Sequence, residues 1–425
     1  MVIDVPRTLA PGTGVANRMS LLPPQPDSPL WSVGVELTAA GGLPEEEIPL
    51  SARMVGASGN SRADALVRGA GEAVERFALH PQPGLRTVRG KATDLAAPTL
   101  AAHDLALGAP ESATAELTWV PGRRLRDGAE LLVPLPLVDW PATDAESHLF
   151  DPGPSGAAAG SSPGMARRAA LLEIVERDAV ICAWERGLRL PAYGDLDALA
   201  VTGPEDVRDR TALAGLWQRA LTQGITPGLS RIPTAVPGLW STVGSLVDRP
   251  GPGALATVGL KASDRPWAAL LGAFQEAWQV RAALQASRTA GFAGPPDGPL
   301  VTEQDRIGFM LTADGYECIR DWVAGFTPAV ADTVPQPVTD EAVIEAILAD
   351  GGDPVEVDLT ARLPTALRRM GWHATKILPV GYQHLRMDET HHWSWNRPRI
   401  ATAADRTGCE ARYPGCSADR PHPLP

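Results

Sequence analysis

The sequence predicts an α+β protein in which mixed sheets alternate with long helices. Two patterns carry this prediction: short apolar runs typical of strands, and longer segments in which apolar residues recur every three or four positions. The chain has 425 residues, 44% of them hydrophobic, and can therefore bury a large core. We find no internal repeat of the kind that builds solenoids or propellers.

Apolar periodicity and the Gly and Pro positions place the elements in order. Residues 1–28, rich in Pro, Thr and Ser, are expected to form a flexible arm, and residues 29–425 the folded domain. Strands are predicted at 31–37, on both sides of a turn at 126–128, and at 239–243, 254–260, 355–359 and 375–379. Helices are predicted at 63–79, 165–186, 265–287, 341–349 and near 364–370, and loops at 151–164 and 322–340.

Composition excludes several classes of function. The formal net charge of −12 argues against nonspecific binding to nucleic acid or to an anionic membrane. The start of the chain lacks a signal-peptide pattern, and no apolar run is long enough for a membrane span, so we expect a cytoplasmic protein. Four cysteines are too few for a disulfide framework, and free thiols are expected.

Three of the predicted helices carry paired polar side chains on one face. Two of them read E-x-x-E-R, with Glu72 and Glu75 in the first and Glu173 and Glu176 in the second. The third carries a carboxylate and an amide at the same spacing. Because positions i, i+3 and i+4 share a helix face, each motif presents its two polar groups side by side.

The residues that flank these carboxylates are apolar, which indicates that the helices are largely buried. Buried like charges are costly unless a cation compensates them. We therefore interpret the four glutamates as oxygen ligands for divalent cations, with neighbouring Arg and Gln side chains as phosphate contacts. The alternative is that Glu72–Arg76 and Glu173–Arg177 are ordinary salt bridges on amphipathic helices. No standard phosphate-binding glycine motif occurs. If the chain binds ATP, it must therefore do so through Mg²⁺ and side chains.

The sequence ends in Pro421-His422-Pro423-Leu424-Pro425. Alternate prolines favour a stiff, extended polyproline II segment, which suggests delivery of a chain end to a defined place. The alternative is a disordered tail.

Together these segments resemble the YcaO superfamily, and within it the azoline-forming cyclodehydratases (D proteins) of thiazole/oxazole-modified peptide pathways. The resemblance covers about residues 31–425. It rests on the order of the first E-x-x-E-R helix, the segment 119–123, the loop 155–160, the helix 170–178, an E-x-x-Q-x-R motif and the P-x-P-x-P end.

This resemblance implies a YcaO-type fold with an ATP site that has no P-loop. It implies Mg²⁺ ligands at Glu72, Glu75, Glu173 and Glu176. It implies nucleotide or phosphate contacts, or a supporting place in that pocket, for Arg76, Ser155, Gly156, Glu276, Gln279 and Arg281.

Two departures from the family pattern affect the expected ATP site. The family often has a Gly-Lys-Gly stretch ahead of the first helix, and residues 54–61 contain no lysine. Ser58 or Ser61 is expected to take over this contact, or Arg53 or Arg62 the charge. The family's serine four residues before the first glutamate is Arg68 here.

The implied reaction joins a Cys, Ser or Thr side chain of a ribosomal precursor peptide to the preceding backbone carbonyl. The amide oxygen accepts the γ-phosphoryl group of ATP and leaves as phosphate, which yields a thiazoline or oxazoline. The terminal carboxylate of Pro425, or His422, is the candidate base. His391 and His392 are alternatives, although such a pair is more often a plain surface feature.

The expected partners are the precursor peptide, a separate leader-binding E1-like protein (one with an RRE domain) and a second copy of the chain in a homodimer. Two other functions stay open. One is a YcaO enzyme that activates the amide for thioamide or macroamidine formation, and the other is a scaffold that binds without turnover.

Overall fold

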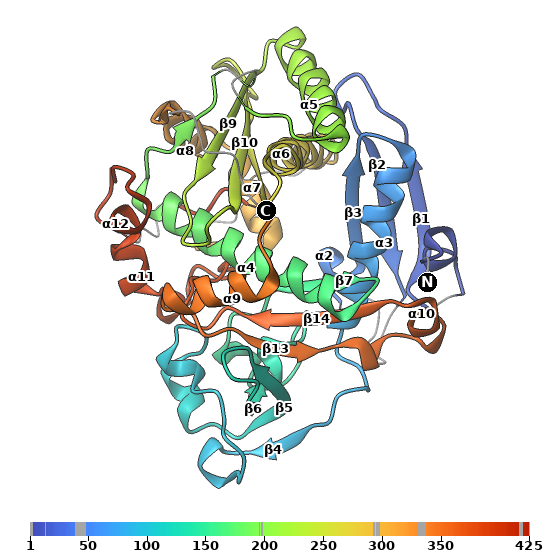
Figure 1. Ribbon diagram of the computed structural model, residues 1–425, viewed down its shortest axis with the longest axis vertical. Coiled ribbons are helices and arrows are strands. Elements are labelled where there is room, and N and C mark those ends of the chain that lie inside the picture. The colour runs from blue at the N-terminus through green and yellow to red at the C-terminus, as the bar shows by residue number, and fades with distance from the viewer. Residues whose placement is uncertain are drawn as a thin grey trace.

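The computed structural model describes residues 3–12, 14–38, 48–194, 196, 199–291, 294, 298–329, 337–415 and 420–424. Within them the strands form three sheets, and the predicted α+β class is confirmed. In Figure 1 the first sheet lies at the right, the second at the top and the third at the bottom, with α4 between the sheets.

The first sheet is antiparallel and has the order β1-β2-β3. Its strands are β1 (Ala16–Leu22), β2 (Trp31–Leu37) and β3 (Met54–Gly59). The expected flexible arm at residues 1–28 is therefore wrong where the structure describes it, because β1 pairs with β2 over six residue pairs. Leu9, Val15 and Ala16 are buried in the core, which explains why this segment is ordered.

The second sheet has the order β11-β10-β9-β8-β12. Its strands are β8 (Pro191–Ala192), β9 (Thr226–Ile232), β10 (Trp240–Val247), β11 (Ala256–Ser263) and β12 (Thr327–Pro328). Strand β10 is buried along its whole length, as expected for a strand covered on both faces.

The third sheet has the order β4-β5-β13-β14-β7, with β6 paired to β5. Its strands are β4 (Val88–Gly90), β5 (Leu117–Arg124), β6 (Glu130–Pro134), β7 (Ala157–Gly160), β13 (Val355–Asp358) and β14 (His373–Leu378). The prediction of a loop over 151–164 is wrong at β7, which the sheet itself stabilises through pairing with β14.

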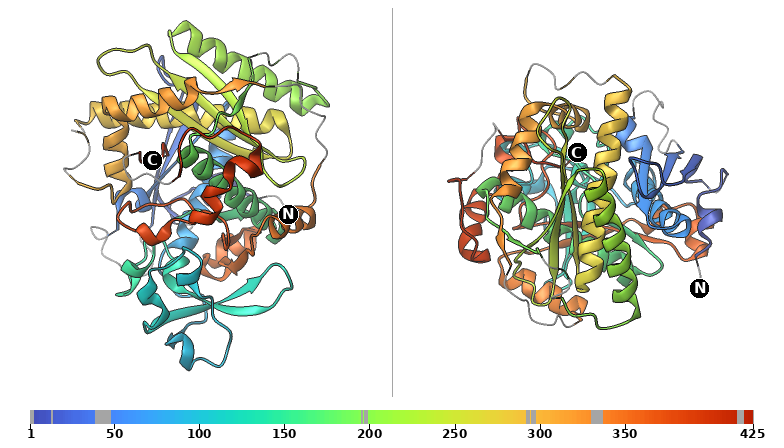
Figure 2. Two further views of the ribbon diagram at one scale, coloured as in Figure 1. Left: turned by 90° about the vertical axis from the view of Figure 1, so that its left-hand side faces the viewer. Right: turned by 90° about the horizontal axis from the view of Figure 1, so that it is seen from above.

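The helices cover these sheets. Their bounds are α1 (Val5–Thr8), α2 (Leu50–Arg53), α3 (Arg62–Leu79), α4 (Pro163–Arg186), α5 (Pro204–Thr222), α6 (Pro266–Thr289), α7 (Glu303–Met310), α8 (Ala313–Ala324), α9 (Asp340–Ala349), α10 (Thr365–Met370), α11 (Arg397–Ala401) and α12 (Ala403–Thr407). Helix α3 packs on β2 and β3, α6 on β10 and β11, and α4 on β7 and β14. Figure 2 shows α6 beside the second sheet, on the side that faces the first.

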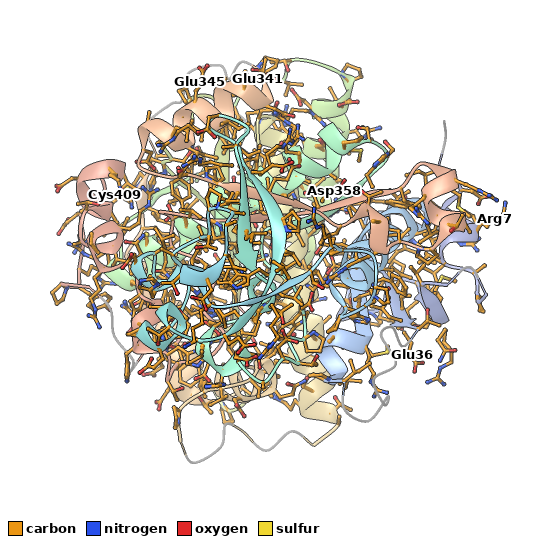
Figure 3. The ribbon with its side chains drawn as sticks, turned by 90° about the horizontal axis from the view of Figure 1, so that it is seen from below. Arg7, Glu36, Glu341, Glu345, Asp358 and Cys409 are labelled. Carbon is orange, nitrogen blue, oxygen red and sulfur yellow. The ribbon has the colours of Figure 1, made fainter. Side chains whose placement is uncertain are left out.

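The predicted helices and most predicted strands are confirmed to within a few residues. The expected loop at 322–340 begins three residues later, because α8 continues to Ala324, and β12 interrupts it. Residues 330–336 lie outside the described part. Figure 3 shows the outer surface from below, with Glu341 and Glu345 of α9 at one edge, Arg7 of α1 at another, and Cys409 beyond α12. Within the described residues, no helix is long and apolar enough to cross a bilayer.

Candidate active site

A cavity of about 930 Å³ lies where α3, α4 and α6 approach the strands β3 and β11. Its charged wall is formed by residues from several separate segments: Arg68, Glu72, Glu75, Arg76, Arg168, Glu173, Glu176, Arg177, Lys261, Asp264, Glu276 and Glu303. Its apolar wall includes Leu385, Met387, Ile307 and Leu424. The cavity therefore brings together side chains that lie far apart in the sequence.

Helix α3 packs on the sheet through a face of small buried residues, and its Glu72 and Glu75 line the cavity. Ser61 caps the helix by accepting a hydrogen bond from the backbone N–H of Asp64, and buried alanines on one side let the helix lie close to the sheet. Arg76 Nη2 lies 3.0 Å from Glu72, and Arg76 Nε lies 3.6 Å from Glu75. Arg76 Nε makes no hydrogen bond within the described residues.

Helix α4 repeats this arrangement on the opposite wall. Arg177 Nε lies 3.4 Å from Glu173 Oε1, and Arg177 Nη2 lies 4.0 Å from Glu176 Oε1. Glu176 is almost fully buried, and its other oxygen accepts a hydrogen bond from the backbone N–H of Ala262 at 2.5 Å. The edge strand β11 thus fixes the orientation of this carboxylate.

Helix α6 supplies a second carboxylate to the same edge of β11. Glu276 Oε2 accepts a hydrogen bond from the backbone N–H of Leu260 at 2.5 Å. Gln279, one turn later, lines the cavity and donates to the carbonyl of Gly56 on β3 at 3.3 Å. Helix α6 therefore links the edges of two different sheets across the cavity.

The electrostatics show that carboxylates from different helices act on one another. Burial raises the pKa of Glu75 well above its usual value, and the charges of Glu72 and Glu173 raise it further. Burial also raises the pKa of Glu173, with Glu176 and Glu72 adding to the effect against the opposing charge of Arg177. The glutamates of α3 and α4 therefore lie close enough to interact electrostatically, and the two E-x-x-E-R motifs meet in one cavity as predicted.

Glu276 belongs to the same electrostatic group. Burial raises its pKa to about 7, although the charge of Arg177 lowers it and that of Glu176 raises it. Burial is the largest cause of these raised pKa values. Among the described residues, seven carboxylates and five cationic side chains line the cavity, so negative charge is in excess there.

This donor set fits a nucleotide with its magnesium ions. Mg²⁺ prefers oxygen ligands and is usually shared between one or two carboxylates and substrate phosphates. The cavity offers such carboxylates, in excess over the cationic side chains that line it. At Arg76 Nε it also offers a buried donor that makes no hydrogen bond within the described residues. As they stand, the described His, Cys, Asp and Glu residues form no group of three already arranged around one ion, because arginines separate the carboxylates.

The other residues predicted for the site fall into two groups. Ser58 and Ser155 line the cavity, as Glu276 and Gln279 do. Ser61, Gly156 and Arg281 are not among the lining residues.

Each of these three has a structural place. Ser61 is the N-cap of α3. Gly156 has a φ of +80° and lies so close to Ile377 that a Cβ would come within 2.2 Å of that carbonyl oxygen. Arg281 pairs with Asp248 at 2.9 Å.

The C-terminal tail reaches the cavity. Leu424 is 3% exposed and forms part of the wall. His422 is also buried but does not line the cavity, and its Nε2 lies 2.6 Å from the carbonyl oxygen of Arg386. Burial and the charge of Arg306 hold the pKa of His422 well below its usual value. Pro425 lies outside the described residues.

The two alternative histidines also lie away from the cavity lining. His391 is partly buried, stacks on Trp393 and faces Asp151 at 3.7 Å. Burial opposes its charged form, but the interaction with Asp151 raises its pKa above the usual value. His392 is exposed, in keeping with the plain-surface alternative.

Several cavity residues were not singled out as contacts from the sequence: Arg168, Arg177, Lys261, Asp264, Gln275 and Glu303. Arg177 could have been found, because it completes the second E-x-x-E-R motif. Lys261 also carries a signal, as an exposed charge in a strand whose other residues are mostly buried. Glu303 carries none, since its position depends on how α7 packs.

A family model described as YcaO cyclodehydratase, ATP- and Mg²⁺-binding, matches residues 56–378, well over half of the chain. The chain belongs to the YcaO family. ATP and Mg²⁺ are the cofactors in the description of this family, and the matched segment contains all three carboxylate helices.

Solved structures have the same YcaO fold. A heterocyclase in complex with substrate and cofactor superposes with a TM-score of 0.70 at 18% identity, over 89% of this chain and 51% of that one. YcaO from Methanopyrus kandleri, bound with AMPPCP and Mg²⁺, gives 0.62 at 20% identity, over 91% and 90%. A chain of the E. coli microcin synthetase McbBCD complex gives 0.64 at 14% identity, over 96% of both chains.

At such low identities the likeness establishes the fold. The chain spans about half the length of the heterocyclase with which it superposes best among these three. No curated protein matches the sequence.

Proposed function

We propose that this YcaO protein is an ATP- and Mg²⁺-dependent cyclodehydratase that forms azolines in a ribosomally made precursor peptide. In the overall reaction, the sulfur or oxygen of a Cys, Ser or Thr side chain bonds to the preceding amide carbon. The amide C–O bond breaks and its oxygen leaves as phosphate, while the amide nitrogen forms a double bond to the same carbon. The side-chain nucleophile and the amide nitrogen each release a proton, and ATP becomes ADP. A cytoplasmic location is part of this proposal, because the reaction consumes ATP.

One observation carries the proposal: carboxylates of three helices and Leu424, near the C-terminus, line the same cavity. An ordinary surface salt-bridge pattern would not bury Glu176 or raise the pKa of Glu75. A cavity of about 930 Å³ also has the size of a pocket for a small ligand.

When bound, ATP supplies the phosphoryl group that turns a poor leaving oxygen into a good one, and Mg²⁺ neutralises charge on the phosphates. Glu72, Glu75, Glu173 and Glu176 are the proposed metal ligands. The backbone amides of Leu260 and Ala262 hold Glu276 and Glu176 in fixed orientations. Such preorganisation matters because phosphoryl transfer depends mainly on positioning and charge stabilisation.

The second group of contacts consists of neutral and cationic side chains. Arg76, Ser58, Ser155 and Gln279 are proposed nucleotide contacts that line the cavity. Ser61, Gly156 and Arg281 are better placed to support the loop and helix geometry, because each is engaged outside the cavity lining.

The apolar wall excludes water from the reacting atoms. Leu424, Ile307, Leu385 and Met387 lie together along it. A dry wall protects an activated amide from hydrolysis and strengthens electrostatic interactions inside the site. His422 is better suited to holding the tail than to accepting a proton, since it does not line the cavity and burial holds its pKa well below the usual value. The terminal carboxylate of Pro425 remains our proposed base.

We propose that a separate leader-binding protein delivers the precursor, and that the chain acts as a homodimer. The first part draws support from the E. coli microcin synthetase McbBCD neighbour, which is a complex of several proteins. The peptide is the proposed substrate because amide activation requires an amide next to a nucleophilic side chain.

The experiment combines the full chain, Mg²⁺, ATP, a precursor peptide rich in Cys, Ser and Thr, and its leader-binding partner. The expected result is the loss of one water per ring by mass spectrometry, with one phosphate released for each ring. Phosphate release together with sulfide or amine incorporation would instead support thioamide or macroamidine formation. Nucleotide binding without any turnover would contradict an enzymatic role.

A further inference from the structure

Lys261 differs from the other cations that line the carboxylate cavity. Among the described residues, five positively charged side chains line it, and the four arginines all have partners. Arg76 and Arg177 face glutamates, Arg168 pairs with Asp264 and Asp340, and Arg68 contacts Asp64 and Gln275.

Within the described part of the chain, the ammonium of Lys261 makes no hydrogen bond or ion pair. Its residue is exposed, although six of the seven other residues of β11 are buried and Ser263, the last, is partly so. An exposed charge on such a strand faces the cavity because the strand edge lies there. Lys261 is therefore a cation in the site without an anionic partner among the residues that the structure describes.

The stem of this lysine lies in a place that the neighbouring helix keeps open. Gly272, in the interior of α6, lines the cavity beside it. A Cβ on Gly272 would meet Lys261 Cγ at 2.7 Å, Cβ at 3.1 Å and Cδ at 3.2 Å. Glycine inside a helix is less stable than alanine at the same position. The close approach of the lysine stem gives this glycine a physical reason.

The charge of Lys261 acts on the same group of acids as the proposed metal ligands. It lowers the pKa of Glu276, which burial raises to about 7. An unpaired ammonium beside oriented carboxylates cannot bind a metal ion, but it can bind an anion that arrives with one. A phosphate oxygen is such an anion, and lysine contacts phosphate as a compact point charge.

We propose that Lys261 binds a phosphate oxygen of the nucleotide in this cavity, and that Gly272 exists to let its side chain lie along α6. This inference deepens the proposed function, since it names one phosphate contact of the same site. It places a lysine charge for the phosphate on β11, whereas residues 54–61, ahead of α3, contain no lysine.

The first test is calorimetric and needs no precursor peptide. K261Q is compared with the unaltered chain in titrations with Mg²⁺-ATP, Mg²⁺-ADP, inorganic phosphate and adenosine. K91Q is the matched control, because Lys91 is an exposed lysine that does not line the cavity. The expected result is about tenfold or greater weakening for ATP in K261Q, as for loss of a charged hydrogen bond. Adenosine should bind all three chains alike.

Comparison of the ligands shows which phosphate group Lys261 contacts. Equal weakening for ATP and ADP would place the contact on the α- or β-phosphate, and weakening for ATP alone on the γ-phosphate. Unchanged ATP affinity in K261Q would overturn the inference. Failure of the unaltered chain to bind any nucleotide would instead defeat the proposed function, so the two failures are distinguishable.

The second test uses the three lysines of the chain, Lys91, Lys261 and Lys376. Reductive methylation with mass spectrometry should modify Lys91 and Lys261 but spare Lys376, which is 3% exposed. Mg²⁺-ATP should protect Lys261 and leave Lys91 unchanged. Equal modification of Lys261 with and without nucleotide would contradict the contact.

The variant G272A tests whether Gly272 leaves room for the side chain of Lys261. Its added methyl group should displace the lysine stem and weaken ATP binding in the same direction as K261Q, while the double variant loses no more than K261Q alone. Thermal unfolding of each variant shows whether the fold is retained. Additive losses would mean that Gly272 and Lys261 act independently.

Discussion

The fully buried guanidinium of Arg306 donates a hydrogen bond to the backbone carbonyl of His422 at 3.3 Å. Its other contacts are the carbonyl of Met387 and the carboxylate of Glu389. Helix α7, which carries Arg306, also presents Glu303 and Ile307 to the cavity. One short helix therefore joins the C-terminal tail to the wall of the site.

Deletion of residues 421–425 should abolish azoline formation. The deletion removes Leu424 from the cavity wall and any carboxylate that follows it. Misplacement of a reacting group by about 1 Å can cost on the order of a hundredfold in rate. The measurement is ring formation by mass spectrometry, together with Mg²⁺-ATP affinity by calorimetry. We expect the rate to fall by at least this factor and nucleotide affinity to change little.

Substitution of Leu424 alone distinguishes the contribution of the apolar wall to the rate from that of the whole tail. In L424A the chain keeps its length and its terminal carboxylate but loses apolar wall area, so a smaller loss of rate is expected. Ring formation that persists in the chain without residues 421–425 would remove the tail from the mechanism and favour another type of amide activation.

The tail should also dock less stably in mild acid. Because burial and the charge of Arg306 lower the pKa of His422, the unfolded chain takes up a proton that the folded chain resists. Stability from this group is present at neutral pH and is lost as pH falls below about 6.5, the usual histidine value. H422Q keeps a donor for the carbonyl of Arg386 but does not titrate. The unaltered chain should lose stability relative to H422Q between about pH 7 and pH 5 in urea unfolding; a constant difference would speak against a buried neutral histidine.

The sequence was sufficient for the long helices of the site because their periodicity is strong and local. Glu173 and Glu176 lie in a helix of 24 residues with an N-cap at Ser162 and a left-handed glycine at position 187. Short elements were harder to predict. Strand β7 reads Ala-Ala-Ala-Gly, which has no strand pattern, and pairing with β14 determines its conformation.

Arg281 shows where spacing within a motif was misleading. Glu276 and Gln279 are three residues apart and share a helix face, but Arg281 lies two residues beyond Gln279 and so points elsewhere. It pairs with Asp248 away from the cavity lining. Glu303, in contrast, enters the cavity only because α7 packs against it, and no local pattern specifies such packing.

Neutralising Glu75 should stabilise the metal-free protein and weaken nucleotide binding. Its pKa is raised well above the usual value by burial and by Glu72 and Glu173, so a neutral isostere relieves repulsion. Arg76 retains Glu72 as a partner at 3.0 Å. In E75Q we expect unfolding to require on the order of 1 kcal/mol more free energy, and Mg²⁺-ATP affinity to fall by at least about tenfold.

The control for this variant is E345Q, at an exposed position of α9 that Figure 3 shows at the outer edge. It should alter neither quantity. If E75Q instead destabilises the protein slightly and leaves nucleotide binding unchanged, the carboxylates would be ordinary helix salt bridges.

Glu276 should make the stability of the metal-free protein depend on pH. Burial raises its pKa from 4.5 to about 7, so the folded chain retains a proton that the unfolded chain has lost in this range. The stability that this group contributes is therefore lost as pH rises from about 4.5 to about 7, and it changes little above that. Each pKa unit corresponds to about 1.4 kcal/mol, which bounds the loss to a few kcal/mol.

The variant E276Q isolates this effect, because an amide oxygen can still accept the hydrogen bond from Leu260 but cannot titrate. Urea unfolding from about pH 5 to pH 8 should show E276Q gaining stability relative to the unaltered chain as pH rises, with a plateau above about pH 7. Mg²⁺ and ATP should shift this window to lower pH, because a nearby cation favours the charged carboxylate. A difference that is independent of both pH and Mg²⁺ would mean that Glu276 is not coupled to the metal site.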